Sequence, residues 1–193
     1  RNIDALEQLT ELATTDSLSE AEIIDRVLEL GAERLDLSLG YLSRIEGRNY
    51  EVVSVVGDHD VIESGATADL EETYCRRVVG EEGDPPVAVR DAEAAGMADD
   101  PAYERFGLGC YLGAEIVVDG ELYGTLCFAD EEPRTEPFSG WEVTLVDLMG
   151  RWVSAALERK LTEDRLRHQN DRLEKVATLV SHDLRNPLNV AEG

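Results

Sequence analysis

The sequence of 193 residues is poor in lysine, in cysteine and in long apolar runs. Its only lysines are Lys160 and Lys175, and the three cysteines (Cys75, Cys110 and Cys127) show no CxxC spacing. An odd number of cysteines without that spacing argues against a disulfide scaffold and against a zinc site. No run of about 18 apolar residues is present, and no signal peptide is visible. These absences predict a cytoplasmic protein without a transmembrane helix in this chain.

Acidic residues far outnumber basic ones, with 42 Asp and Glu against 18 Lys and Arg. Residues 1–150 hold 35 of the acidic and ten of the basic residues, a net charge of −25, whereas residues 151–193 have a net charge of +1. Such an acidic domain repels nucleic acid and anionic membranes. Dispersed carboxylates and scarce lysine are typical of a protein adapted to high salt, where screening weakens the repulsion. A docking surface for a basic partner is the alternative.

Apolar periodicity predicts both helices and strands. Ser17-Leu-Ser-Glu20 resembles a helix cap, and Asp119-Gly120 is the strongest turn signal. The predicted helices cover residues 3–12, 20–37, 70–79 and a long segment from an N-cap at Ser139 to about 161 and onward. The predicted strands cover residues 39–45, 50–56, 87–89, 110–118 and 121–130, with an irregular segment over 91–107. This order predicts an α+β fold with an antiparallel sheet and flanking helices, followed by a long C-terminal coiled-coil helix.

Several short motifs accompany this order: Glu72-Thr-Tyr-Cys75, Tyr111-Leu-Gly-Ala-Glu-Ile-Val117, Asp119-Gly120, Tyr123-Gly-Thr-Leu-Cys-Phe-Ala129 and Pro137-Phe-Ser139. Together with the element order they resemble a GAF domain of the signal-transduction type, over about residues 5–157. We therefore assign residues 1–157 to a GAF sensor domain. The resemblance implies that helices cover one face of the sheet, while the segment 58–110 covers the other face and encloses a ligand pocket.

The same resemblance implies a set of residues that line the pocket, namely Tyr74, Cys75, Cys110, Tyr111 and Phe128. Three cysteines near one pocket would suit redox sensing or a thioether to a chromophore. We favour the alternative that they are small buried apolar side chains, and the tetrapyrrole signature of phytochrome-type GAF domains is not apparent. His59, in the polar loop 57–60, is a candidate haem ligand or, as we favour, a solvated loop residue. The ligand is not identified by the sequence.

The segment 158–177 has the spacing of an imperfect coiled coil. Leu166, Leu173 and Val180 are seven residues apart, and Val176 takes the second apolar position of the heptad. Gln169 and Asn170 interrupt the seam, and the step from Leu161 to Leu166 indicates a stutter. A flawed seam has two registers of similar energy, which suits a helix that transmits a signal. We expect a parallel homodimer through this helix, a solvated linker helix being the alternative.

Residues 178–193 contain Ser181-His-Asp-Leu-Arg-Asn-Pro-Leu188. This octapeptide resembles the phospho-acceptor box of two-component sensor histidine kinases, at the start of their dimerisation and phosphotransfer domain. A neutral imidazole nitrogen of His182 can attack the γ-phosphorus of ATP. Asp183 can accept the proton of the other ring nitrogen, and the resemblance gives Asn186 the role of orienting a water for dephosphorylation of the partner.

The sequence therefore predicts the sensory and phospho-acceptor portion of a cytoplasmic histidine kinase. Its expected partners are a second copy of the chain and the receiver domain of a response regulator, without nucleic acid or membrane. ATP with Mg²⁺ is expected only for a longer parent protein, because no ATP-binding lobe is visible between residues 1 and 193, and this chain alone should be inactive. The alternative is a non-enzymatic GAF module that binds a ligand or dimerises and regulates a fused output domain such as a transcription factor.

Overall fold

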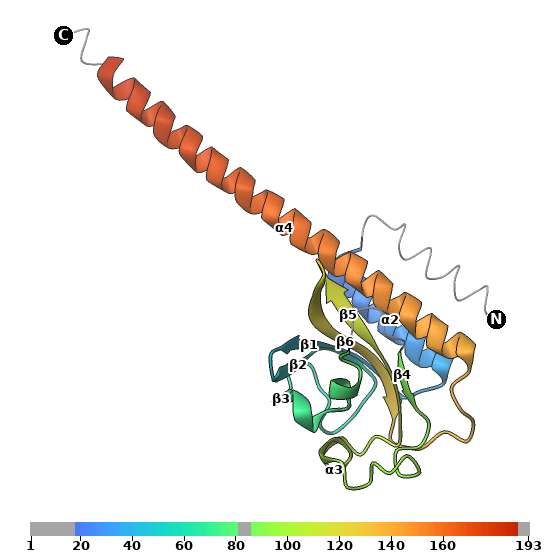
Figure 1. The fold of residues 1–193 in the computed structure, drawn as a ribbon. Coiled ribbons are helices and arrows are strands. Elements are labelled where there is room, and N and C mark those ends of the chain that lie inside the picture. The colour runs from blue at the N-terminus through green and yellow to red at the C-terminus, as the bar shows by residue number, and fades with distance from the viewer. Residues whose placement is uncertain (1–17, 81–85, 189–193) are drawn as a thin grey trace. The chain divides into compact units, whose positions relative to one another are not determined.

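The computed structural model describes residues 18–80 and 86–188, with side chains up to residue 178 (Figure 1). The helices and strands are, in chain order, α2 (Glu20–Leu35), β1 (Leu39–Glu46), β2 (Asn49–Val56), β3 (Thr67–Asp69), the 3-10 helices η1 (Leu70–Glu72) and η2 (Tyr74–Arg77), β4 (Val87–Val89), α3 (Pro101–Phe106), β5 (Cys110–Val118), β6 (Glu121–Asp130) and α4 (Gly140–Leu188). None of the helices described has the length and apolar character needed to cross a bilayer. The helix predicted over residues 3–12 lies outside the described residues.

The six strands form one antiparallel sheet in the order β3-β2-β1-β6-β5-β4. The turn between β5 and β6 consists of Asp119 and Gly120, whose φ angles are 53° and 78°. A two-residue hairpin turn of this kind requires positive φ at both central positions, which explains the Asp-Gly pair. Both predicted hairpins and the predicted fold class are confirmed.

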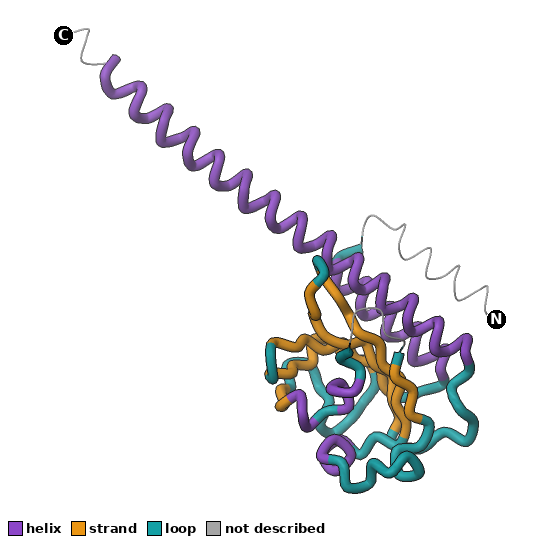
Figure 2. The backbone as a smooth tube through the Cα atoms, viewed as in Figure 1, coloured by secondary structure: helices purple, strands orange, loops and turns teal. Residues whose placement is uncertain are grey.

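Helix α2 and residues 140–156 of α4 cover one face of this sheet (Figure 2). Gly31 of α2 lies against the ring of Phe128, and Gly150 of α4 lies against Ala114 and Ile116. Phe128 pairs with Leu112 across β5 and β6, and Leu112, Ala114 and Ile116 alternate onto one face of β5. Both helices begin with a Ser–Glu capping arrangement, Ser19 with Glu22 and Ser139 with Glu142.

The segment between β2 and β5 covers the other face of the sheet. Its apolar residues pack in one cluster with the inward side chains of β1, β2, β5 and β6. Three details differ from the sequence-based expectation. Residues 70–79 form two 3-10 helices separated by the extended residue Thr73 rather than one helix, residues 91–107 contain the short helix α3, and β3 was not predicted. Elements as short as β3 and α3 carry little periodicity, so sequence patterns locate them poorly.

Asp100 fixes η2 to α3. Its carboxylate accepts hydrogen bonds from the guanidinium groups of Arg76 and Arg77 and from the backbone N–H of Ala102, at the N-terminus of α3. Burial raises the pKa of this carboxyl group, but the hydrogen bonds from Arg76 and Ala102 outweigh burial and lower the pKa to about 2. Since Cys75 lies directly before Arg76, this contact also determines where Cys75 sits.

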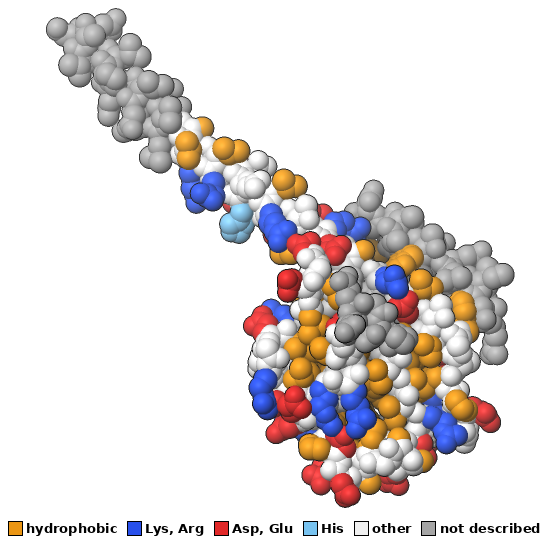
Figure 3. All heavy atoms as spheres, in the orientation of Figure 1, with side chains coloured by type: hydrophobic (Ala, Val, Ile, Leu, Met, Phe, Trp, Pro, Cys, Tyr) orange, Lys and Arg blue, Asp and Glu red, His pale blue; other side chains and the backbone are white. Residues whose placement is uncertain are grey.

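Residues 157 onward of α4 form a second compact unit. Its described part exposes large apolar side chains among charged ones (Figure 3): Leu161, Leu166, Leu173 and Val176 are 38%, 57%, 67% and 56% exposed. These are residues of the predicted coiled-coil seam.

The two helix glycines that face the sheet should respond differently to alanine. A Cβ at Gly31 would collide with the Phe128 ring, whereas a Cβ at Gly150 would meet its neighbours at 3.4 Å or more. We expect Gly31→Ala to lower the free energy of unfolding by about 1–3 kcal/mol through overpacking. Gly150→Ala should leave it unchanged or raise it by up to about 1 kcal/mol, because alanine is the better helix former. Urea unfolding of both variants measures the difference, and equal effects would contradict this packing.

Asp100→Asn should remove a pH-dependent part of the stability. The folded-state pKa of Asp100 is about 2, below the ordinary 3.8, so its contribution is complete above about pH 4 and is lost as the pH falls towards 2. Asparagine still caps α3. We expect the variant to be less stable by about 1–2 kcal/mol at pH 7, after allowance for the partial exposure of both arginines. The deficit, followed by denaturant unfolding, should shrink between pH 4 and 2, and parallel stability curves would refute this assignment.

Candidate functional site

A cluster of thiols and hydroxyls is buried in the centre of the sheet, on the face opposite α2 and α4. We call it the thiol cluster and define it by Tyr41 and Ser43 of β1, Tyr50 of β2, Cys75 of η2, Tyr111 of β5, and Thr125 and Cys127 of β6. None of these residues is more than 3% exposed. The cluster is thus a polar group of side chains within an otherwise apolar core.

The register of the sheet places these side chains side by side. Tyr41 pairs with Cys127 and Ser43 pairs with Thr125 across β1 and β6. On the other side, Cys127 pairs with Gly113 of β5, two residues from Tyr111. A Cβ at Gly113 would collide with the Tyr111 hydroxyl. Because glycine has no side chain, this hydroxyl can lie beside the Cys127 thiol.

Hydrogen bonds connect the cluster. The Tyr111 hydroxyl lies 2.9 Å from the Cys127 Sγ, and the Thr125 hydroxyl donates to the Cys75 Sγ at 3.0 Å. The Ser43 and Thr125 hydroxyls lie 2.7 Å apart. The two sulfur atoms, Cys75 Sγ and Cys127 Sγ, lie 3.8 Å apart. Each thiol therefore has a hydroxyl neighbour and the other thiol within contact distance.

The environment shifts the pKa values of Cys75 and Cys127 in opposite directions. Burial raises the pKa of Cys75, but the hydrogen bonds from the Cys127 thiol and from neighbouring hydroxyls outweigh burial and lower the pKa to about 7. Burial, together with the hydrogen bond and charge of Cys75, raises the pKa of Cys127 well above its ordinary value. Of the two thiols, Cys75 is therefore the one that loses its proton first. A thiolate is the form of cysteine that acts as nucleophile and reductant.

Tyr74 covers the cluster from η2. Its ring stacks on that of Tyr111 with centroids 5.4 Å apart, and its hydroxyl donates to the Leu108 carbonyl oxygen at 2.8 Å. Burial raises the pKa of the Tyr111 hydroxyl well above its ordinary range, so this group stays protonated and can donate.

The structure brings together some of the pocket residues named from the sequence and separates others. Tyr74, Cys75 and Tyr111 share the apolar cluster on one face of the sheet. Phe128 lies against Gly31 on the helix-covered face, and Cys110 alternates with Tyr111 along β5, so it lies on that face too. The lining set named from the sequence did not include Thr125 or Cys127, although all three cysteines were expected near one pocket. The parity of the strand was the available signal, because neighbours such as Cys127 and Phe128 cannot line the same face.

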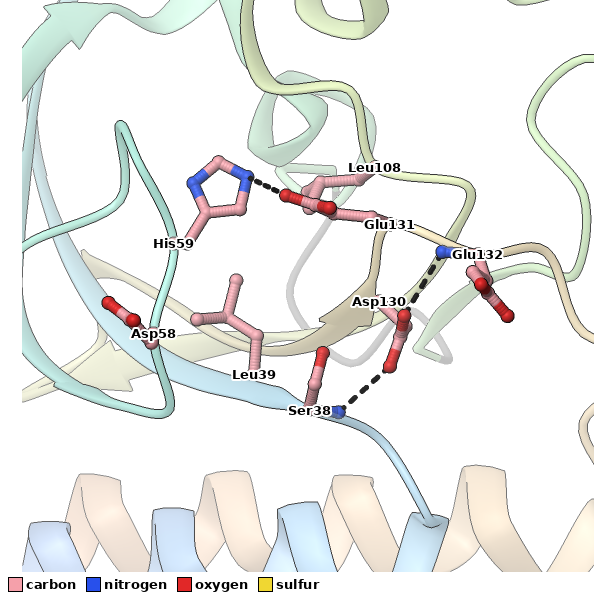
Figure 4. A pocket seen from close by; sticks show the side chains of 8 residues that line it. All are labelled: Ser38, Leu39, Asp58, His59, Leu108, Asp130, Glu131 and Glu132. Atoms are coloured by element: carbon pink, nitrogen blue, oxygen red, sulfur yellow. Dashed lines mark hydrogen bonds and ion pairs between the residues drawn. The ribbon is translucent and has the colours of Figure 1, made fainter.

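A second candidate site is a surface pocket of about 250 Å³, shown in Figure 4 and lined by Ser38, Leu39, Asp58, His59, Leu108, Asp130, Glu131 and Glu132. The His59 side chain is 5% exposed, unlike the solvated residue that we expected. Its Nδ1 accepts from the backbone N–H groups of Val61 and Ile62, each at 3.1 Å, so Nε2 carries the proton and donates to the Phe106 carbonyl oxygen at 2.9 Å. Neither ring nitrogen is left to bind a haem iron in this arrangement.

The candidate phospho-acceptor residues lie within the helical backbone of α4, at His182, Asp183 and Asn186. Their side chains lie outside the described residues. Their roles remain predictions from the sequence.

Solved structures of similar fold come from several different proteins. The GAF domain of an Acinetobacter phosphoenolpyruvate-protein phosphotransferase is 15% identical with a TM-score of 0.66, covering 85% of this chain and 97% of its own. A phycoerythrobilin-bound GAF domain of a cyanobacterial phytochrome is 15% identical with a TM-score of 0.68, covering 85% and 98%. A domain of a putative two-component sensor histidine kinase from Sinorhizobium meliloti is 15% identical with a TM-score of 0.55, covering 78% and 99%.

At these identities the likeness establishes the fold alone. A comparison with curated protein sequences finds no match. Residues 19–157 match the family described as GAF domain. With that match over most of its length, and with the antiparallel sheet and flanking helices described above, the chain belongs to the GAF domain family.

Proposed function

We propose that this GAF domain is the sensory part of a two-component histidine kinase in the cytoplasm, and that His182 is its phospho-acceptor. The observation that carries the proposal is that α4, which begins on the GAF sheet at Gly140, also contains the acceptor-like box around His182. In this proposal residues 1–157 sense, 158–177 transmit, and 178–193 begin the dimerisation and phosphotransfer domain.

The chemistry at the box follows from its side chains. A neutral imidazole is a good nucleophile near pH 7, and in-line attack on the γ-phosphorus of ATP gives a phosphoramidate. Asp183 accepts the proton from the ring nitrogen that does not attack. Asn186 is four residues from His182 and shares its helix face, where it can orient a water during dephosphorylation of a response regulator.

The exposed apolar residues of α4 support a homodimer. Leu166, Leu173 and Val176 are each more than half exposed, and their spacing is that of a two-stranded seam. Burial of such a side chain contributes roughly 1.5–3 kcal/mol. We further propose that the acidic surface is an adaptation to high salt, since repulsion between two copies of the region 1–150, each of net charge −25, is screened there.

A GAF module that regulates a different output is the second candidate. The confirmed GAF fold suits it equally, since folds of this kind host different functions. The two candidates differ in whether His182 takes up phosphate, so the acceptor experiment decides between them.

When the chain is joined to the ATP-binding lobe of a histidine kinase, His182→Gln should abolish acid-labile phosphorylation, because glutamine has no nucleophilic nitrogen. His168→Gln, on the exposed part of the same helix, is the matched control and should label normally. Asn186→Ala should label normally and slow dephosphorylation of the receiver domain. Radiolabelling with [γ-³²P]ATP measures all three. Full labelling of the His182 variant would refute the acceptor and favour the second candidate.

Dimerisation should depend on salt. The Debye length is about 30 Å in 0.01 M salt and about 3 Å in 1 M, so light scattering should find monomers at low salt and dimers at high salt. Leu173→Asp should raise the salt midpoint and weaken the dimer about tenfold or more, through lost apolar burial. Thr178→Asp adds the same charge at an exposed position outside the seam and should change little. A chain that stays monomeric up to molar salt would rule out this dimer.

A further inference from the structure

We propose that Cys75 and Cys127 are a redox-active pair that closes reversibly to a disulfide when a peroxide enters the domain. The inference deepens the proposed function, because it names the class of signal that the GAF domain senses. It rests on that function only for what happens downstream of the domain.

The two sulfur atoms are in contact and one of them lies on a small element. Their separation of 3.8 Å must fall to about 2.05 Å in a disulfide, so a shift of about 2 Å suffices. Cys127 is fixed in β6, which is paired with strands on both sides. Cys75 lies on η2, a 3-10 helix of four residues, so η2 is the element that moves.

The contacts assign different roles to the two cysteines. The Thr125 hydroxyl donates to the Cys75 Sγ at 3.0 Å, whereas the Cys127 thiol donates to the Thr125 hydroxyl at 3.3 Å. The thiolate that attacks is therefore that of Cys75, whose pKa is lowered to about 7. Cys127, whose pKa is raised, keeps its proton until the second step and resolves the intermediate.

Both steps balance with hydrogen peroxide as the oxidant. The Cys75 thiolate attacks one peroxide oxygen, the O–O bond breaks, and the departing hydroxide takes up a proton to become water, which leaves a sulfenic acid on Cys75. The sulfur of Cys127 then attacks the sulfur of Cys75, the S–O bond breaks, and the hydroxide that leaves takes the Cys127 proton as the second water. Two thiols thus lose two electrons to one peroxide.

Cys110 is an internal control. It is equally buried, but it lies on the opposite face of the sheet, where burial and the nearby charge of Asp130 raise its pKa to about 11. It has neither a thiolate at neutral pH nor a thiol partner in the described part of the chain.

Formation of the Cys75–Cys127 disulfide should change contacts that extend from the core to the surface of the domain. Movement of η2 alters the Asp100 contacts with Arg76 and Arg77. It also changes the bonding of the sulfur that lies 2.9 Å from the Tyr111 hydroxyl on β5, the strand whose opposite face packs on α4 near Gly150. A covalent change in the core thereby biases β5, the strand on which α4 packs at Gly150.

The test uses the reduced 193-residue chain, treated with a small excess of hydrogen peroxide and then alkylated after denaturation. Mass spectrometry should find a Cys75–Cys127 disulfide peptide, one alkylated thiol at Cys110, and full reversal by dithiothreitol. Cys110→Ser should behave like the wild type. Cys127→Ser should stop at a sulfenic acid on Cys75 that dimedone traps. His182→Gln should also form the disulfide, so that failure of the acceptor and failure of the thiol pair are told apart.

The rate of thiol oxidation tests the same pair without a cysteine variant, which could fail to fold. The oxidation rate of the wild type should rise with pH around a midpoint near 7, whereas the denatured chain should follow an ordinary thiol value of 9.0. Thr125→Val removes the hydroxyl that donates to Cys75 and should slow oxidation about tenfold at pH 7. Three thiols that remain alkylatable, or a rate and midpoint equal to those of the denatured chain, would overturn the proposal.

Discussion

The pairing of β1 with β6 holds the domain together, because it joins the hairpin β1–β2 to the hairpin β5–β6 in one sheet. The strands β1 and β6 can approach each other this closely because residue 124 is glycine: any Cβ there would collide with the carbonyl oxygen of Ser43. This register sets Thr125 beside Ser43 and Cys127 beside Tyr41. Without this pairing, the residues of the thiol cluster would not lie on one sheet. The sheet face that packs against α2 and α4 would also be split into two parts.

Local features were predictable from the sequence, whereas the contact between the two thiols was not. The capping arrangement at Ser19 and the Asp119-Gly120 turn are encoded within a few residues, so their helix and hairpin were found. The contact between Cys75 and Cys127 joins residues 52 apart in sequence and depends on a register that no local pattern contains. The 3-10 helix that positions Cys75 has only four residues, too few for periodicity to show. The side chains of α4 are described only up to residue 178. The proposed role of His182 therefore depends on the sequence motif around it.

Arginine is the cation that organises the acidic surface of the domain. Arg134 donates to the Leu35 carbonyl oxygen and to Glu142, and its guanidinium lies 4.3 Å from the centre of the Phe138 ring. A lysine ammonium has no planar fork with which to make all three contacts. The few basic residues of this domain are therefore arginines, and one arginine can bind several groups at once. This suits a surface on which acidic side chains greatly outnumber basic ones.

Gly113 has a consequence for how related domains differ. The Tyr111 hydroxyl occupies the space that a side chain at this position would fill, so the chemistry beside Cys127 depends on an atom that is absent. A single methyl group there would displace the hydroxyl while leaving both cysteines in the sequence. Two chains with identical cysteines can thus differ in the reactivity of those cysteines through one neighbouring position, and the residue opposite the thiol is as informative as the thiol itself.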